Sequence, residues 1–245
     1  MKEKSMRKID EELIKAVQND DVKAVGALVR KGADVNVQNE YGQTPLHMTI
    51  FKGARNLFET LLLLGADVNQ KDCFGVPPLH RAIRLNRLKM MRRLLCEDKI
   101  NINQTDRYGF SAMHLASFAG FALDDLSLLV SAGANVNQRN GWGETPLFCV
   151  STVNTAQNLL KLGADTGVKN RWGEVVFDYF DKKALQQKKD ILKRLKYQQI
   201  AFNLKNFQTP VVSFVSGKKR LDYLRGLKGT SFLKYKRMVW QNDRG

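Results

Sequence analysis

The chain has 245 residues, of which 43% are hydrophobic and 26% charged, as is typical of one or two soluble globular domains. No apolar run approaches the roughly 20 residues that span a bilayer, and the N-terminal segment MKEKSMRKIDEE lacks the apolar stretch of a secretory signal. Three scattered cysteines are too few for a disulfide framework, which favours a reducing compartment. The net charge is +16, and residues 172–245 contribute +11 of it.

Two short phrases recur along the chain in a common register. The phrase Gly-Ala-Asp-Val-Asn ends at Asn36 and Asn69, and related phrases end at Asn103 and Asn137, at spacings of 33, 34 and 34 residues. The phrase Thr-Pro-Leu-His ends at His47, and its variants end at His80, His114 and Phe148. An aromatic residue followed by glycine lies nine residues after each glycine of the first phrase, beginning with Tyr41-Gly42. A period of 33 to 34 residues indicates a solenoid of stacked units.

These phrases and the Leu-rich runs between them resemble the ankyrin repeat family. The resemblance implies a mainly α fold, a solenoid of helix-turn-helix units with β-hairpin-like loops. The basic residues beyond the repeats predict a C-terminal extension at 198–245. The resemblance covers about residues 8–197 of a predicted array at 1–197, with an N-terminal capping repeat at about 8–38 and a C-terminal capping repeat at about 170–197. The internal repeats are then the second (39–71), third (72–105), fourth (106–139) and fifth (140–169).

The helix ends of each unit follow from local chemistry. Thr44 is a good N-cap and Pro45 a good first helical residue, and Gly65 suits the left-handed end of the second helix. The third repeat has Asn86 where its neighbours have glycine. The fifth repeat is three residues short between Phe148 and Gly163, so we expect clipped helices or an irregular turn there.

The three histidines occupy the same place in successive repeats. Equivalent atoms of stacked helices lie about 8–10 Å apart, which is too far to share one metal ion at roughly 2 Å from each nitrogen. We therefore expect each imidazole to bond to a neighbouring backbone group and link repeats. The asparagine of each Asp-Val-Asn phrase is expected to bond to the backbone of its own turn. No catalytic, metal or cofactor motif is found, so neither an enzyme nor a cofactor is predicted.

The resemblance implies a partner-binding concave face built from loop tips and exposed first-helix positions. Aromatic and arginine side chains are enriched at such interfaces. The alternative is that each ring packs against its own turn and its neighbour. The predicted binding residues are Tyr41, Phe51, Lys52, Phe74, Arg84, Tyr108, Phe118, Trp142 and Trp172.

A basic cluster with no acidic residue within it lies in the third repeat. Arg81 and Arg84 fall on the expected first helix, and Lys89, Arg92 and Arg93 on the second. The two groups should face opposite sides of the stack, so a single groove for a polyanion is not favoured. Arg84 is the best candidate for pairing with a carboxylate or phosphate, and a solvated surface is the alternative.

Residues 198–245 do not follow the repeat and mix basic clusters with apolar side chains. This composition favours either an element that folds on the last repeat or a separate contact with nucleic acid or anionic lipid. The polyanion-binding candidates are Lys218, Lys219, Arg220, Lys234, Lys236 and Arg237.

The sequence therefore predicts a non-catalytic protein-interaction module, acting as an adaptor or scaffold, that binds a partner protein through the concave face of the stack. One alternative is a polyanion-binding protein acting through its tail. A second is an effector that an intracellular bacterium secretes into a host cell. We expect a monomer in the cytoplasm, with the nucleus or a host cytosol as the alternative locations.

Overall fold

The computed structural model describes residues 6–182, which are helical and contain no β-strand in that range. The predicted helical solenoid of repeated units is confirmed. The chain divides into two compact units at Val168–Lys169. The elements are α1 (Lys8–Gln18), α2 (Val22–Arg30), α3 (Pro45–Lys52), α4 (Arg55–Leu63), α5 (Pro78–Arg84), α6 (Leu88–Leu94), α7 (Ala112–Ala119), α8 (Leu123–Ser131), the 3₁₀ helix η1 (Pro146–Cys149), α9 (Val153–Lys161) and α10 (Val176–Lys182).

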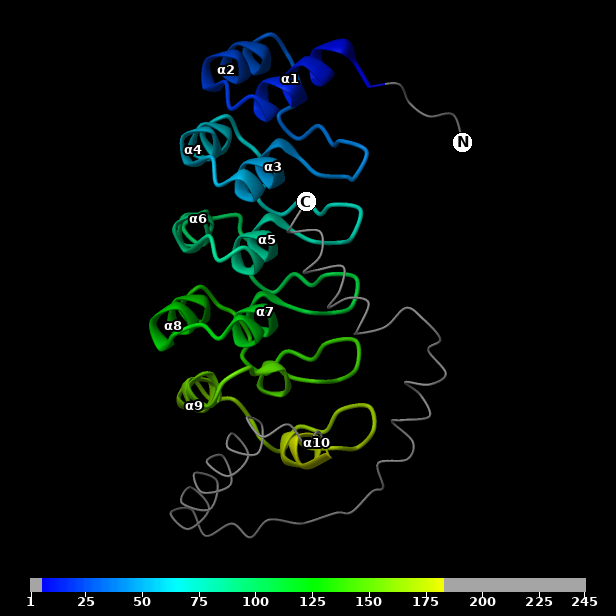
Figure 1. Ribbon diagram of the computed structural model, residues 1–245, viewed down its shortest axis with the longest axis vertical. Helices are drawn as coiled ribbons and strands as arrows, with labels where there is room; N and C mark the ends of the chain where they lie inside the picture. The colour runs from blue at the N-terminus through cyan, green and yellow to red at the C-terminus, as the bar shows by residue number, and fades with distance from the viewer. Residues whose placement is uncertain (1–5, 183–245) are drawn as a thin grey trace. The chain divides into compact units, whose positions relative to one another are not determined.

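In the first unit the helices form successive pairs that stack on one another (Figure 1). The first helices of the pairs form one layer, in which α3 contacts α5, α5 contacts α7 and α7 contacts η1. The second helices form the other layer, and the chain between pairs makes loops that project from the first-helix side. Apolar side chains from both layers fill the core between them. Its largest fully buried members include Leu46, Ile50, Phe58, Ile83, Met91 and Leu126.

The ends of α3 show why these sequences fold as short helices. The Thr44 hydroxyl accepts a hydrogen bond from the His47 N–H, and Pro45 occupies the first helical position, where a missing N–H costs nothing. Gly53 ends the helix with φ +77°. Asn86 takes the equivalent left-handed position after α5 with φ +52°, which asparagine tolerates better than most residues. The third repeat therefore keeps the same turn although Asn86 replaces the glycine of its neighbours.

The loops pack so closely that equivalent positions in the second and fourth repeats require glycine. Gly42 and Gly109 have positive φ, and a Cβ atom there would lie 2.5 Å from the Cys73 or Gly141 nitrogen in the next loop. A side chain at either position would therefore push the two loops apart.

The short fifth repeat has the clipped helix that its length predicts. Its first helix, η1, is a 3₁₀ helix of 4 residues, whereas α3 and α7 each have 8. Val150 follows with extended backbone angles, and Thr152 then caps α9 by accepting from the Thr155 N–H. Phe148 and Val150 are nevertheless buried, so the shortened segment still contributes to the core.

The described part of the second unit consists of residues 169–182, a loop followed by α10. Residues 183–197 of the predicted C-terminal repeat and the whole 198–245 extension lie outside the described residues. None of the helices within residues 6–182 combines the length and apolar character needed to cross a membrane.

Candidate protein-binding surface

The loop tips are shaped by one side chain in each repeat. Asn39, Asp72, Asp106 and Asn140 each use the Oδ1 atom to accept hydrogen bonds from the backbone two and four residues later. This Asx geometry fixes the turn without help from the aromatic residue at its tip. The tip side chain is therefore available for contacts with other loops or with a partner.

Successive tips are joined directly by the backbone. The Cys73 N–H donates to the Tyr41 carbonyl at 3.1 Å, and the Gly141 N–H donates to the Tyr108 carbonyl at 2.8 Å. Arg107 makes the intervening connection through its side chain, donating from Nε to the Phe74 carbonyl and from Nη2 to the Cys73 carbonyl. The four tips of the first unit therefore form one continuous ridge.

The aromatic side chains of this ridge differ in how much they offer to a partner. Tyr41 is 53% exposed, whereas Phe74 is half-buried with the Arg107 guanidinium 4.9 Å from its ring centroid. Tyr108 and Trp142 stack with centroids 6.1 Å apart and planes 13° apart, and Trp142 also contacts Phe110 at 5.5 Å. The aromatic residues therefore do not form a row of separate exposed rings, because Tyr108 and Trp142 pack against each other. Trp172 is half-buried at the equivalent turn of the second unit.

The predicted first-helix positions lie near the C-terminal ends of their helices. Phe51 is 44% exposed, and the neighbouring Lys52 ammonium donates to the Gln18 carbonyl at the end of α1. Arg84, the last residue of α5, and Phe118, in the last turn of α7, are both half-buried. Phe51 is therefore the most exposed apolar side chain among these positions.

Carboxylates from the sequence neighbourhood and from adjacent repeats neutralise much of the basic cluster. The Arg81 guanidinium bonds to the Asp72 carboxylate at 2.8 Å, with the Asp72 side chain fully buried. On the second-helix layer, Arg92 pairs with Asp125 and Arg93 pairs with Glu59 and Glu97. All four carboxylates lie outside residues 81–93: Asp72 and Glu97 flank this segment, and Glu59 and Asp125 are more than 30 residues from the arginines they bind.

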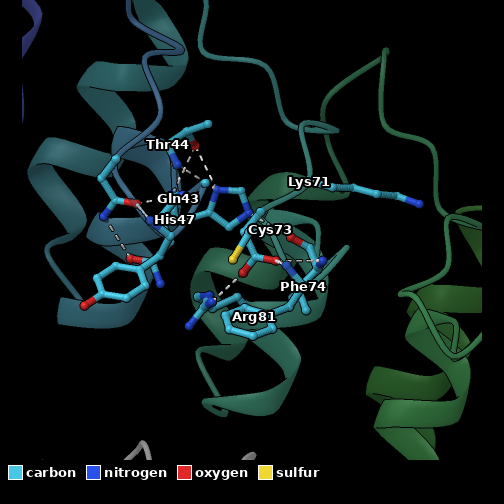
Figure 2. Close-up of polar contacts among 12 residues, drawn as sticks. Gln43, Thr44, His47, Lys71, Cys73, Phe74 and Arg81 are labelled. Atoms are coloured by element: carbon cyan, nitrogen blue, oxygen red, sulfur yellow. Dashed lines mark hydrogen bonds and ion pairs between the residues drawn. The ribbon is translucent and has the colours of Figure 1, made fainter. Parts of the chain in front are cut away.

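His47 and His114 link repeats through the backbone, as expected from the sequence. The Nδ1 atom of His47 lies 2.8 Å from the Thr44 hydroxyl, and its Nε2 atom lies 3.0 Å from the Val76 carbonyl in the next loop (Figure 2). His114 makes the corresponding contacts with the Ser111 hydroxyl and the Glu144 carbonyl. Burial lowers the pKa of each imidazole from 6.5 to about 4, so both rings are neutral near pH 7.

His80 does not form the predicted link. Neither of its buried ring nitrogens has a hydrogen-bond partner of normal geometry, and only a weaker contact with the Gln104 backbone favours the protonated ring. Pro77 stands where the other repeats have Thr44 or Ser111 and has neither a hydroxyl nor an N–H to offer Nδ1. Burial lowers the pKa of His80 to about 3, and the positive charges of Lys71 and Arg84 lower it further. The prediction that every imidazole links repeats is therefore wrong for this one.

The repeated asparagines also differ from the prediction. Their own turns are bonded by the residue two positions earlier, as when the Asn36 N–H donates to Asp34 Oδ1. The Asn69 side chain instead crosses to the next repeat, where it accepts from the Asn101 N–H and donates to the Lys99 carbonyl. Related contacts join Asn36 to Asp67, Asn103 to Gly133 and Asn135, and Asn137 to Gly163 and Asp165.

Two cations near the predicted surface were missed by the sequence interpretation. Lys71 donates to the Thr105 carbonyl at 2.6 Å, and Arg107 binds the neighbouring tip. Arg87, a member of the basic cluster, donates to the Phe51 carbonyl at 3.2 Å. Figure 2 shows Lys71 directed away from Arg81 and toward the following repeat. Lys71 directly precedes Asp72, and Arg107 directly follows Asp106, the equivalent residue of the next repeat. Aligning the repeats on these aspartates could therefore have identified both cations.

The remaining predicted sites are not placed by the structure. The six polyanion-binding candidates of the tail, from Lys218 to Arg237, lie outside the described residues. Within residues 6–182, no three side chains of His, Cys, Asp or Glu gather into a group that could hold a metal ion.

Comparison with known proteins supports the family. A family model described as ankyrin repeats (3 copies) matches residues 13–106 and 50–140, which together cover more than half of the chain. Neurogenic locus notch homolog protein 1 of Mus musculus is 33% identical over 129 residues, 51% of this chain and 5% of that protein. Ankyrin repeat-containing protein P1E11.10 of Schizosaccharomyces pombe is 39% identical over 75 residues, 30% of this chain and 36% of that protein.

A viral protein gives a shorter match. Ankyrin repeat protein OPG189 of Monkeypox virus is 40% identical over 55 residues, 22% of this chain and 10% of that protein. The chain thus spans only a small part of the length of the notch and viral relatives, and about a third of the yeast one. The matched region coincides with the stacked helix pairs. The chain belongs to the ankyrin repeat family.

Proposed function

We propose that the chain is a non-catalytic adaptor or scaffold that binds a partner protein through the loop tips and first helices of its stack. Ankyrin repeats are generally protein–protein interaction modules. The observation that carries the proposal is the exposure of Tyr41 and Phe51 on a stack whose backbone is already fixed. A large apolar ring held rigidly at the surface binds with little loss of conformational freedom.

The rest of the face supports this function in a different way. Tyr108 and Trp142 pack against each other, so they can present one broad apolar surface. Replacing either ring by alanine would uncover the other as well as change the contact with a partner. Tyr41 and Phe51 are therefore the cleaner positions to test, because their removal disturbs less of the stack.

The test is proximity labelling in the native cell with the full chain. Tyr41→Ala/Phe51→Ala should reduce the labelling of a discrete set of proteins more than tenfold, because a central aromatic contributes about 2 kcal/mol or more to an interface. Leu63→Ala is the matched control, since Leu63 is 84% exposed at the end of α4 in the second-helix layer. An unchanged set of labelled proteins in the double variant would show that the partner binds elsewhere.

The basic extension offers a second route to function on sequence grounds. Binding to nucleic acid or anionic lipid through residues 198–245 should weaken steeply with salt, because it depends on neutralising phosphates. Comparing the full chain with a variant in which Lys218, Lys219 and Arg220 are changed to alanine tests this route. Loss of RNA or vesicle binding with unchanged protein labelling would assign the two functions to separate parts of the chain.

A further inference from the structure

Two sets of cations in the second, third and fourth repeats make side-chain contacts of different kinds. Arg92 and Arg93 in the second-helix layer are paired with carboxylates. A second group donates to main-chain carbonyls and forms no ion pair with any described residue. We call its members the carbonyl-held cations: Lys52, Lys71, Arg87 and Arg107.

A carbonyl contact fixes a cation without cancelling its charge. A carbonyl oxygen carries only a partial charge, and the guanidinium of Arg107 has five N–H donors, of which two are used here. Stacking over Phe74 holds the group in place. Arg107 is exposed, so its remaining donors and its full positive charge are available in a fixed position.

The carbonyl-held cations lie beside the exposed aromatic side chains. Lys71 belongs to the loop that carries Phe74, and Arg107 belongs to the loop that carries Tyr108 and bonds to the Cys73 and Phe74 carbonyls. Lys52 and Arg87 lie where α3 ends, and Arg87 bonds to the carbonyl of Phe51 itself. A partner that contacts all four cations must therefore extend from the loop tips to the C-terminal end of α3.

We propose that this surface binds an acidic segment of a partner protein, whose carboxylates pair with the carbonyl-held cations while its apolar side chains contact Tyr41 and Phe51. The proposal rests on the proposed function and adds the chemistry of the partner. The charge of the surface carries it: four fixed cations face solvent without a carboxylate from the described residues to neutralise them. Buried arginine–carboxylate pairs would give orientation and specificity as well as attraction.

The same side chains fit a nucleic acid less well. Proteins that bind single strands stack bases on aromatic rings with open faces. Here Arg107 covers one face of Phe74, and Tyr108 and Trp142 cover each other. A protein segment can combine carboxylates with small apolar groups and adapt to this pattern.

The test is selection from a random 12-residue peptide display library on the full chain. The enriched peptides should carry net negative charge together with apolar residues, and their affinity should fall as salt rises. Lys71→Glu/Arg107→Glu should weaken them roughly tenfold or more. Lys23→Glu/Lys89→Glu makes the same change of charge at exposed positions on α2 and α6 and should leave affinity nearly unchanged. Circular dichroism should show that both variants remain folded.

Each other outcome has a distinct meaning. Enriched peptides that are neutral or basic would overturn the acidic partner while leaving a protein-binding face. Acidic peptides that bind both double variants equally would place their site elsewhere, including in the basic extension. Failure to enrich any peptide would count against the proposed function as well. A dT12 oligonucleotide whose binding is lost in Lys71→Glu/Arg107→Glu, with peptides unaffected, would replace the acidic segment by a nucleic acid.

Discussion

The second and third repeats solve the same packing problem with different chemistry. In the second, Thr44 and His47 cap the first helix and tie it to the next loop. In the third, Pro77 removes the cap and the partner of the His80 Nδ1 atom, the Nε2 atom also lacks a bond to the next loop, and Arg81 bonds to the buried Asp72. The fifth repeat shows the converse, because Phe148 replaces histidine and the buried Thr145 hydroxyl lacks a partner. The N-cap hydroxyl and the histidine imidazole therefore satisfy each other's hydrogen bonds only where a repeat contains both.

The largest effect should come from acid, which charges the buried histidines. The unfolded chain binds protons near pH 6.5, whereas the folded pKa values are about 4, 3 and 4 for His47, His80 and His114. Stability is therefore complete above pH 6.5 and falls as pH decreases toward 4, by about 1.4 kcal/mol per pH unit for each histidine. For three histidines between pH 6.5 and pH 5, this amounts to about 6 kcal/mol. Urea unfolding followed by circular dichroism should therefore show that the free energy of unfolding is lower by about this amount at pH 5 than at pH 7.5.

His80→Gln sharpens this prediction for the third repeat. Removing one of three titrating groups should reduce the acid-induced loss by about one third. His80 has no hydrogen bond of normal geometry to lose, so the variant should cost little at pH 7.5. Equal unfolding free energies at the two pH values in the parent chain would contradict the account of all three imidazoles.

Arg81→Met should be the next most damaging change. It leaves the fully buried Asp72 carboxylate without its cation, which should cost about 3 kcal/mol. Arg92→Met is the matched control, because Arg92 is exposed and its pair with Asp125 lies at the surface, where such pairs contribute about 1 kcal/mol or less. Similar losses in melting temperature for the two variants would mean that Arg81 does not replace the missing cap.

Pro77→Thr should stabilise the third repeat. Threonine adopts the extended backbone found at this position and would supply both the hydroxyl and the N–H that His80 lacks. The new cap and the paired imidazole should raise the free energy of unfolding. Loss of proline lowers it, because the unfolded chain gains conformational freedom. The expected net gain is about 1 kcal/mol. Thr44→Ala makes the opposite change in the second repeat and should cost about 1 kcal/mol or more. A destabilised Pro77→Thr variant would show that His80 cannot use the new partners.

Asn69→Ala should have the smallest of these effects. It removes the hydrogen bonds to the Lys99 carbonyl and the Asn101 N–H that join the second and third repeats. Solvent reaches these groups, so the expected loss is about 1 kcal/mol. Asn56→Ala, at an exposed position on α4, should change the unfolding free energy much less. If the two alanine variants are equally stable, the asparagine contacts between repeats contribute nothing measurable.

The helical stack was predictable because its determinants are local and repeated. Thr44, Pro45 and Gly65 indicate helix ends on their own, and the short spacing after Phe148 was enough to predict a clipped first helix. Asn86 keeps the turn that glycine makes in neighbouring repeats. Failures arose where a role depends on a partner in another repeat. Nothing local to His80 shows that it lacks partners until Pro77 is considered as the residue that should supply them.

The candidate surface was predictable in position but not in exposure. Register alone located Tyr41, Tyr108 and Trp142 at loop tips. Their packing depends on the residue at the equivalent position of the next loop, and Gly141 lets the tips of Tyr108 and Trp142 approach closely. Glu97, four residues after Arg93, is a partner that the sequence does show, but Glu59 and the Phe74 carbonyl that holds Arg107 are both more than 30 residues from the cations they bind.

The most direct test of the binding surface is hydrogen–deuterium exchange of the full chain with and without an enriched acidic peptide. The account predicts slower exchange in the loops that carry Tyr41, Phe74 and Tyr108 and at the end of α3, with little change in α4, α6 and α8. Protection confined to the second helices, or to the basic extension, would contradict it.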